Sequence, residues 1–311
     1  MLTFILVGRH AEAPLSIQVR ETGVLVDSTE SVYTQAPIAH AVPVSQKIHR
    51  IYLRPIKFMT YENDSASAST SPVSPLRLLI IGTDTGVGKS HVTATIVSAL
   101  RQIGHQVWVH KPVACGDWDG EQAEDGRLYR QLCATDQDPD SACPWQFPEA
   151  CSPHLAARLA GHTLTRAELL QGLKRCLRPD RDLVIEGAGG LLAPLSEDGC
   201  DIADLAAACA ALTIIVTRPH LGTINHTRLT VAHARQRGLR LLGLVLNHHQ
   251  PHLSGVAVEH AASELARWCD LPVIAELPYD CQLPAAAEGL TAHPLAQQLI
   301  ASILRANPEV E

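Results

Sequence analysis

The stretch Gly82–Ser90 has the residue types and spacing needed to hold a nucleoside triphosphate. It reads Gly-Thr-Asp-Thr-Gly-Val-Gly-Lys-Ser and stands between an apolar run, Leu78–Ile81, and a segment of helical periodicity. Glycines allow a turn whose backbone N–H groups converge on phosphate oxygens, and the following helix adds the positive end of its dipole. Five residues separate Gly82 from Gly88, one more than in the common Walker A pattern. This spacing indicates a subclass of phosphate-loop proteins.

Two side chains at the end of this loop can act on phosphates and on a metal. Lys89 supplies a positive charge for the β and γ phosphates, and Ser90 carries a hydroxyl that can bind Mg²⁺. The pattern therefore predicts ATP contacts along the whole turn. The residues concerned are Asp84, Thr85, Gly86, Val87, Gly88, Lys89 and Ser90.

A lysine and a glutamate stand at the ends of two further apolar segments. Lys111 follows Gln106–His110, and the proline after it favours an extended backbone, which would direct the lysine toward the phosphate loop. Glu186 ends the apolar segment Asp182–Glu186 before a glycine-rich turn, as a Mg²⁺ ligand would, bound directly or through water. Each residue alone could be a solvated lysine or a capping glutamate. Beside a phosphate loop, the two together indicate phosphoryl chemistry.

The elements that must position these residues alternate along the chain. Strands are expected at Arg77–Ile81, Gln106–His110, Asp182–Glu186, Leu212–Thr217, Arg240–Asn247 and Pro272–Leu277. Helices are expected at Lys89–Gln102, Gln122–Ala134, Thr165–Leu177, Asp201–Ala210, Asn225–Arg237 and Val256–Trp268. Continuously apolar strands are typical of a parallel sheet that is covered on both faces. The alternation predicts an α/β fold with a doubly wound, mainly parallel sheet of the P-loop NTPase type and ligands at the carboxyl ends of the strands.

The first 75 residues do not share this alternation. Residues 1–58 contain short apolar segments without a sustained period, and residues 65–75 are rich in Ser and Pro and cannot bury enough apolar surface to fold. We expect a disordered or poorly structured extension at 1–58, a linker at 59–75 and the functional domain at 76–311. Met59 is an alternative start, in which case 1–58 is an overextension of unknown role.

Composition excludes several functional classes. The net charge of −7 and the isoelectric point near 6.1 provide no basic field for nucleic acid. No apolar run approaches the ~20 residues that span a bilayer, and the Leu2–Val7 run lacks the flanks of a signal peptide, so a cytoplasmic protein without a membrane partner is expected. Nine scattered cysteines without a Cys-x-x-Cys pair argue against a disulfide framework. His248, His249 and His252 have no completing ligand at metal spacing and are interpreted as surface residues.

In combination, the motifs resemble those of dethiobiotin synthetases. After the phosphate loop come Lys111–Gly116, Ser152–Ala157, Val184–Gly190 and Leu221–His226, in the order of that family, and the resemblance covers about residues 76–305. It implies an ATP- and Mg²⁺-dependent ligase of biotin synthesis, which closes a cyclic urea on 7,8-diaminopelargonic acid with CO₂. In that reaction one amine forms a carbamate, ATP converts the carbamate to a mixed anhydride, and the second amine attacks as phosphate leaves.

The resemblance also implies roles for individual residues. Lys89 and Lys111 would supply cations to the carbamate and the phosphoryl group, and Thr85 would donate a hydrogen bond to the carbamate. The metal ligands would be Ser90, Glu186 and an aspartate after Lys111. We assign that aspartate to Asp125, at the start of the helical pattern Gly126–Cys133. Asp117 and Asp119 are the weaker alternatives, since the spacing from Lys111 is not fixed.

Further contacts with ATP and substrate follow from the same resemblance. ATP would also meet Glu186, Gly187, Ala188 and Gly189, while Asn247 would contact the adenine, unless it is only a polar strand end. The substrate would meet Cys115, Leu221, Gly222 and Asn225. In the family, the turn at 221–225 receives the substrate's carboxylate at a helix N-terminus across a homodimer interface.

The chain departs from the family pattern at three places. Cys115 stands where a serine is expected, and a thiol is the weaker donor. His220 stands where a lysine is usual, so any charge there depends on pH. Ala150 and Cys151 replace a more usual Pro-x before Ser-Pro-His.

Three other functions are weighed against this one. An amidotransferase-like synthetase of the cobyrinic-acid type normally has a glutaminase domain, for which the chain has no room. A partitioning or septum-positioning ATPase carries a signature lysine early in the loop, and residues 83–87 contain none. A catalytically inactive nucleotide-binding regulator is favoured only if Cys115 and His220 prove damaging. The choice between ATP and CTP stays open.

Overall fold

The structure, a computed structural model, describes residues 74–248, 250, 254–279 and 294–306, together with the backbone of four short N-terminal strands. These are β1 (Thr3–Leu6), β2 (Ile17–Arg20), β3 (Val24–Val26) and β4 (Val32–Thr34), and they pair antiparallel as β1 with β2 and β3 with β4. The chain divides into two units, Met1–Ser67 and Ala68–Glu311. The rest of the expected extension at 1–58, its alternative start Met59 and nearly all of the linker at 59–75 lie outside the described residues.

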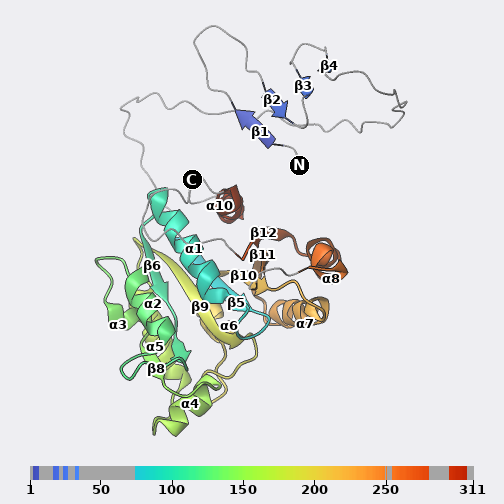
Figure 1. The fold of residues 1–311 in the computed structure, drawn as a ribbon. Coiled ribbons are helices and arrows are strands. Elements are labelled where there is room, and N and C mark those ends of the chain that lie inside the picture. Colours follow the sequence, from blue (N-terminus) through green and yellow to red (C-terminus); the bar gives the residue numbers. More distant parts are fainter. Residues whose placement is uncertain are drawn as a thin grey trace, which may run out of the picture. The chain divides into compact units, whose positions relative to one another are not determined.

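A six-stranded parallel sheet forms the centre of the second unit (Figure 1). Its order is β12-β11-β10-β5-β9-β6. The bounds are β5 (Arg77–Gly82), β6 (Val107–His110), β9 (Asp182–Gly190), β10 (Leu212–Thr217), β11 (Arg240–Asn247) and β12 (Val273–Leu277). The expected parallel α/β fold is thereby confirmed. Because β5 lies between β9 and β10, the loop that follows it opens in the middle of the carboxyl edge of the sheet.

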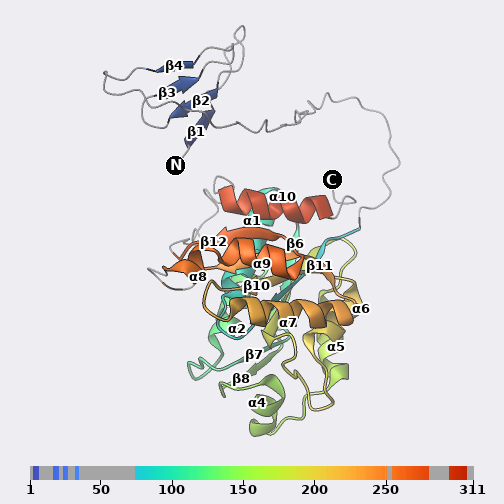
Figure 2. The same cartoon turned by 90° about the vertical axis from the view of Figure 1, so that its right-hand side faces the viewer.

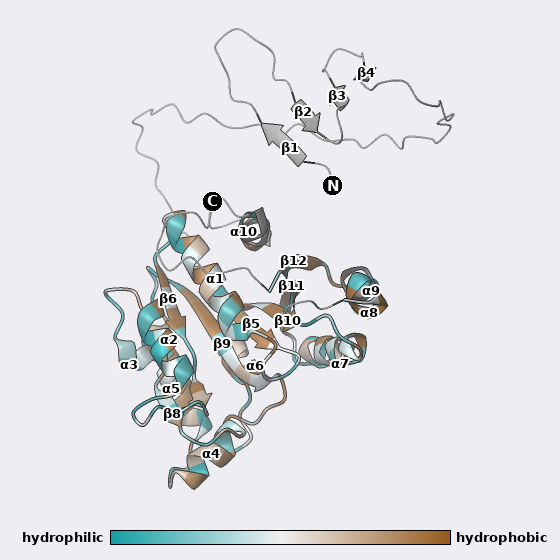
Figure 3. Cartoon of the chain, viewed as in Figure 1, coloured by the Kyte–Doolittle hydropathy of each residue, from teal (hydrophilic) through white to brown (hydrophobic). Residues whose placement is uncertain are grey.

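Helices cover both faces of the sheet (Figure 2). They are α1 (Lys89–Gln102), α2 (Glu124–Leu132), α3 (Pro139–Ala142), α4 (Pro153–Leu159), α5 (Arg166–Cys176), α6 (Ile202–Cys209), α7 (Thr223–Gln236), α8 (Val256–Glu259), α9 (Ala261–Cys269) and α10 (Pro294–Ala306). In β5, Leu78 and Ile80 belong to the core shared with α1, whereas Leu79 and Ile81 belong to the core shared with α5, α6, α7 and α9. Successive strand residues face opposite sides, so a strand buried on both faces must be apolar throughout, as Figure 3 shows for this sheet.

The elements that sequence patterns did not predict are mostly short. The strands β7 (Val113–Cys115) and β8 (Trp145–Phe147) pair in parallel beside the main sheet, α4 contacts both of them, and α3 contacts β6. Segments of three to seven residues are too short to carry a recognisable period. The longer α10 was also unpredicted. The helix expected at Val256–Trp268 is interrupted at His260, where one residue separates α8 from α9.

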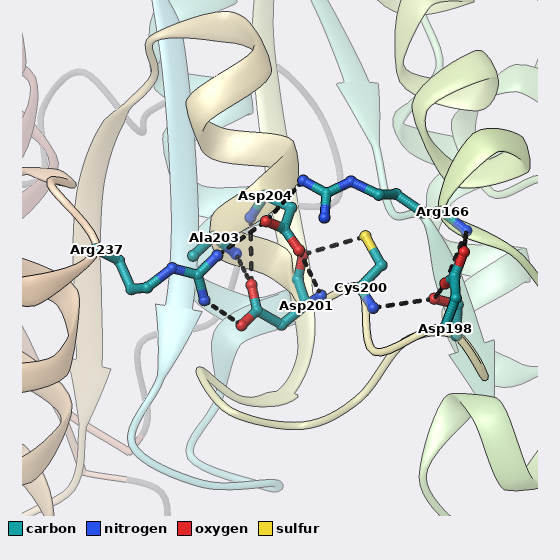
Figure 4. Close-up of polar contacts among 8 residues, drawn as sticks. Arg166, Asp198, Cys200, Asp201, Ala203, Asp204 and Arg237 are labelled. Carbon is teal, nitrogen blue, oxygen red and sulfur yellow. Dashed lines mark hydrogen bonds and ion pairs between the residues drawn. The ribbon is translucent and has the colours of Figure 1, made fainter.

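The start of α6 is held by charges from two other helices (Figure 4). Asp201 caps the helix by accepting the N–H groups of Ala203 and Asp204, while the Asp204 carboxylate accepts the N–H of Asp201 in return. Arg166 of α5 and Arg237 at the end of α7 each place a guanidinium nitrogen 2.9 Å from Asp204 Oδ1.

Ile202, the first residue of α6, lies close to the glycine-rich end of β9, where Gly187–Gly190 continue the strand instead of forming the expected turn. A Cβ on Gly187 would lie 3.2 Å from Ile202 Cγ1. That distance leaves little room for any side chain at 187. The position of α6 therefore determines how closely Ile202 packs against Gly187 in β9.

Candidate active site

The phosphate loop is a tight turn that joins β5 to α1. Gly86 and Gly88 have φ angles of 72° and 94°, a left-handed backbone conformation that residues other than glycine rarely adopt. The loop begins on the sheet, where the Thr83 N–H donates to the Val216 carbonyl of β10 at 3.0 Å. A Cβ on Gly82 would lie 2.8 Å from Val87 Cγ2, so the loop closes on its own first residue.

Asn247, at the end of β11, supports the loop from the neighbouring strand. Its Nδ2 donates to the Val87 carbonyl at 3.0 Å, and its side chain is only 5% exposed. A Cβ on Gly88 would lie 2.0 Å from this nitrogen. Position 88 therefore requires glycine for two reasons: its φ angle is left-handed, and the Asn247 side chain leaves no room for a Cβ. The expected adenine contact of Asn247 stays a prediction.

Lys89 is buried at the start of α1. Its ammonium donates to the Asp84 carbonyl at 2.9 Å, folding back over the loop. Burial lowers the pKa of Lys89 to about 8, although the nearby Glu186 carboxylate opposes that shift. Asp84 and Thr85 are exposed at the tip of the loop, and the Thr85 hydroxyl lies 3.6 Å from the position of a Cβ on Gly189. The tip therefore faces the glycine-rich end of β9.

Four of the sequence-predicted residues meet beneath the loop. Ser90 Oγ lies 3.0 Å from Asp125 Oδ1 and 2.8 Å from Glu186 Oε1. The Lys111 ammonium lies 2.5 Å from Asp125 Oδ2 and 2.6 Å from Glu186 Oε1. These residues come from α1, α2, the end of β6 and β9, so the cluster requires the complete fold.

The opposite charges in this cluster determine the protonation of Lys111 and Asp125. Burial disfavours the Lys111 ammonium, yet Glu186 and Asp125 outweigh burial and raise the pKa of Lys111. Burial likewise opposes ionisation of Asp125, but Lys111 and the hydrogen bond from Ser90 lower its pKa. Lysine and aspartate are therefore both charged at neutral pH. A buried carboxylate such as Glu186 is tolerated because it is paired and hydrogen-bonded.

The oxygen atoms of this cluster fit Mg²⁺. Mg²⁺ is usually held by one or two carboxylates together with water and substrate phosphates. Ser90, Asp125 and Glu186 supply one hydroxyl and two carboxylates, and within the described ranges no group of three His, Cys, Asp or Glu side chains suggests a metal cage elsewhere. In this structure the cation among these oxygens is the Lys111 ammonium.

Tyr129 of α2 belongs to the cluster, and the sequence analysis missed it. Its hydroxyl donates to Glu186 Oε2 at 2.7 Å, and the side chain is completely buried. The residue lies four positions after Asp125, which places both on one face of the helix. That spacing was a visible signal, but a buried aromatic residue on a helix is ordinarily read as core.

The two alternative aspartates lie away from the cluster. Asp119 accepts the N–H groups of Glu121 and Gln122, each at 2.9 Å, and pairs with Arg127. Asp117 has a positive φ of 48°, and its carbonyl accepts the Glu124 N–H. Both residues shape the turn that leads into α2. Of the three candidates, Asp125 is the one that contacts Ser90.

The expected substrate residues are spread over two places. Cys115 is half-buried at the end of β7, where burial and then the neighbouring Cys151 raise the pKa of its thiol to about 12, so it stays protonated. Leu221, Gly222 and Asn225 lie at the exposed N-terminus of α7, and none of the described contacts joins them to the lysine cluster.

A cavity of about 350 Å³ lies between the phosphate loop and α7. Its lining includes Thr83, Asp84, Gly190, Leu192, His226 and Leu229. The expected ATP turn and the motif at 221–226 therefore border one space within a single chain.

In the part of the chain that the structure describes, the helices are too short or too polar to cross a membrane.

The chain is similar to known proteins over most of its length. A family model described as an AAA domain matches residues 76–287. An ATP-dependent dethiobiotin synthetase from Anaeromyxobacter dehalogenans is 36% identical over 213 residues, which covers 68% of this chain and 94% of that protein. One from Mycobacterium avium is 39% identical over 216 residues, covering 68% and 90%. A solved MinC:MinD cell division complex from Aquifex aeolicus aligns with a TM-score of 0.43 at 15% identity, over 74% of this chain and 94% of that one.

Proposed function

The chain belongs to the dethiobiotin synthetase family, and we propose that the cluster beneath its phosphate loop carries out that family's ring closure. The protein is an ATP-dependent ligase of biotin synthesis, which forms dethiobiotin. The observation that carries the residue assignment is the meeting of Ser90, Lys111, Asp125 and Glu186 within hydrogen-bond distance. The substrates implied are 7,8-diaminopelargonic acid, CO₂ and ATP.

We infer that Lys89 and the loop backbone hold the phosphates of ATP. The N–H groups of the turn and the start of α1 provide a positive field for anionic oxygens. Lys89 leaves the Asp84 carbonyl to meet the transferred phosphoryl group, where its charge stabilises the transition state. Catalysis then rests on position and charge, because phosphoryl transfer needs little covalent help from the protein.

Ser90, Asp125 and Glu186 would hold Mg²⁺. Held by these three side chains, Mg²⁺ would supply positive charge to stabilise the phosphoryl transfer. Lys111 pairs with the same carboxylates, so a bound Mg²⁺ would compete with its ammonium for those oxygens. We therefore expect Lys111 to turn toward the carbamate, a negatively charged group that needs a cation. Thr85, which is exposed at the tip of the loop, would donate to the same carbamate.

We further propose a homodimer with the substrate between the subunits. Leu192, Leu221 and Leu229 are exposed by 64%, 92% and 63%, and Leu192 and Leu229 both line the cavity beside the phosphate loop. Large exposed apolar side chains that gather at one place favour contact with another protein surface. A second copy would cover them and bring the N-terminus of α7 to the substrate's carboxylate.

A cytoplasmic location is proposed from the cysteines. The eight cysteines within the described ranges are all free thiols, and all eight lie in the apolar cores or pack against them. Free cysteines in such numbers are typical of proteins kept in a reducing compartment.

The decisive experiment measures ADP release with and without the diamine and bicarbonate. ADP release that requires both substrates supports ring closure, whereas hydrolysis independent of the diamine would favour a nucleotide switch.

Glu186→Gln should raise the Mg²⁺ concentration needed for half-maximal rate at least about tenfold, because an amide oxygen binds the cation more weakly than a carboxylate. Unchanged Mg²⁺ dependence would move the metal ligand elsewhere.

A further inference from the structure

Tyr129 gives the two oxygens of Glu186 different environments. Oε1 faces Ser90 at 2.8 Å and Lys111 at 2.6 Å, on the side of the proposed metal. Oε2 accepts the Tyr129 hydroxyl at 2.7 Å. The carboxylate is fully buried, so it cannot exchange these partners for solvent. One oxygen is thereby held back while the other stays available to a cation.

The phenol is well suited to this task. A phenol hydroxyl carries one donor, and here that donor meets a carboxylate oxygen, which can only accept. The ring packs in the core beneath α1 and the sheet, among residues that include Val92, Ile96 and Val184. Asp125, one turn earlier on the same helix, contacts Ser90 and Lys111. α2 therefore supports the cluster at two points.

We propose that Tyr129 is a positioning residue that keeps Glu186 a one-oxygen ligand and so makes the site prefer Mg²⁺ to the larger Ca²⁺. Mg²⁺ requires near-octahedral geometry with few protein ligands, whereas Ca²⁺ accepts six to eight oxygens and readily takes both oxygens of one carboxylate. A Glu186 whose second oxygen is occupied cannot offer the two-oxygen contact. The inference rests on the proposed function, because it takes Glu186 to be a metal ligand.

The test is the substitution Tyr129→Phe, which keeps the ring and removes the hydroxyl. Mg²⁺ and Ca²⁺ are each titrated into the full chain with ADP, and binding is followed by calorimetry. We expect the Mg²⁺ affinity to fall about 10- to 100-fold, as for other residues that orient a metal ligand. The Ca²⁺ affinity should fall much less, so that the preference for Mg²⁺ shrinks by about tenfold. Tyr279→Phe, on a tyrosine that is 56% exposed, is the matched control and should change neither affinity.

Two results of the Tyr129→Phe titrations would overturn the inference. An unchanged ratio of the Mg²⁺ and Ca²⁺ affinities would do so, and so would an equal loss of both, which is the mark of a general structural defect. If Tyr129→Phe does not fold, Tyr129→Gln provides a shorter side chain that still carries a donor, and it should retain a preference for Mg²⁺. Loss of the preference in a folded Tyr129→Gln protein would also contradict the proposal.

Glu186→Gln separates failure of this inference from failure of the proposed function. If Glu186→Gln binds Mg²⁺ like the unmodified chain, the metal site itself is misassigned. If Glu186→Gln weakens Mg²⁺ binding while Tyr129→Phe changes nothing, the metal site stands and the role of Tyr129 is refuted.

Discussion

The ammonium of Lys111 lies 2.6 Å from the carboxylate of Glu186, and both side chains are buried. Lys111→Met should therefore destabilise the metal-free protein by about 3–5 kcal/mol, because it leaves a buried carboxylate without its partner. The free energy of unfolding in urea measures this effect. The double variant Lys111→Met/Glu186→Gln removes both charges and should lose less stability than Lys111→Met alone. Equal losses would show that the unpaired charge of Glu186 is not what destabilises Lys111→Met.

Lys89→Ala should lower kcat by about 100- to 1,000-fold, the range seen when one preorganised donor is removed from a transition state. ADP release at saturating ATP measures the effect. Lys174→Ala, an exposed lysine on α5, is the control and should leave the rate unchanged. Near-normal turnover of Lys89→Ala would refute the proposed mechanism.

Gly88→Ala should abolish ATP binding, because it adds a collision with Asn247 to the strain of a left-handed backbone. Gly104→Ala is a matched control, since Gly104 has a φ of 97° with nothing within 4 Å of the added Cβ. Gly104→Ala should cost only the backbone strain of about 1–2 kcal/mol and bind ATP normally. Fluorescence titration with a labelled nucleotide distinguishes the two variants. Similar ATP affinities would show that the close approach of Asn247 is unimportant.

Stability should fall in mild acid because of His110. This histidine is completely buried, its Nδ1 lies 3.0 Å from the Ser141 carbonyl, and burial lowers its pKa to about 4. The unfolded chain takes up a proton near pH ~6.5, whereas the folded chain does so only near pH 4. The contribution of neutral His110 to the free energy of unfolding is therefore fully present above the unfolded pKa. It is lost as the pH falls from about 6.5 toward about 4, by on the order of 3 kcal/mol in total.

Urea unfolding of His110→Asn across this pH range checks the assignment. Asparagine keeps a donor for the Ser141 carbonyl but does not titrate, so the acid-dependent loss should become smaller by about that amount. His260→Asn, at an exposed histidine, should keep the pH dependence of the unmodified chain. A profile of His110→Asn that matches the unmodified chain would assign the loss to other groups.

Removal of residues 1–58 should leave turnover and thermal stability unchanged. The second unit contains the whole six-stranded sheet and both cores. Melting temperature and ADP release of the shortened chain are the measurements. Loss of folding would overturn the expected domain boundary, and peptides from residues 1–58 in native protein would exclude Met59 as the start.

The sequence was sufficient for the parts of the site that lie at strand ends. Lys111 and Glu186 could be placed together because neighbouring parallel strands bring their carboxyl ends to one edge. Asp125 was selected from three aspartates by its place at the start of a helical pattern, and it is the one that contacts Ser90.

What the sequence could not provide depends on contacts between distant elements. The Asn247 side chain reaches the Val87 carbonyl, 160 positions away, because β11 and β5 both flank β10. The pairing of β7 with β8 was missed because strands of three residues show no alternation. Tyr129 was missed because, apart from its hydroxyl, it resembles any aromatic residue of the core. Only the fold shows that this hydroxyl donates to Glu186.

The anchor of α6 implies that two regions of the molecule respond differently to ionic strength. Arg166 and Arg237, which hold Asp204, have side chains exposed by 51% and 29%, so added salt screens their attraction. The Lys111–Glu186 pair is buried, and screening reaches it far less. Concentrated salt should therefore loosen α6, and with it the contact of Ile202 on Gly187, while the ion pair beneath the phosphate loop persists.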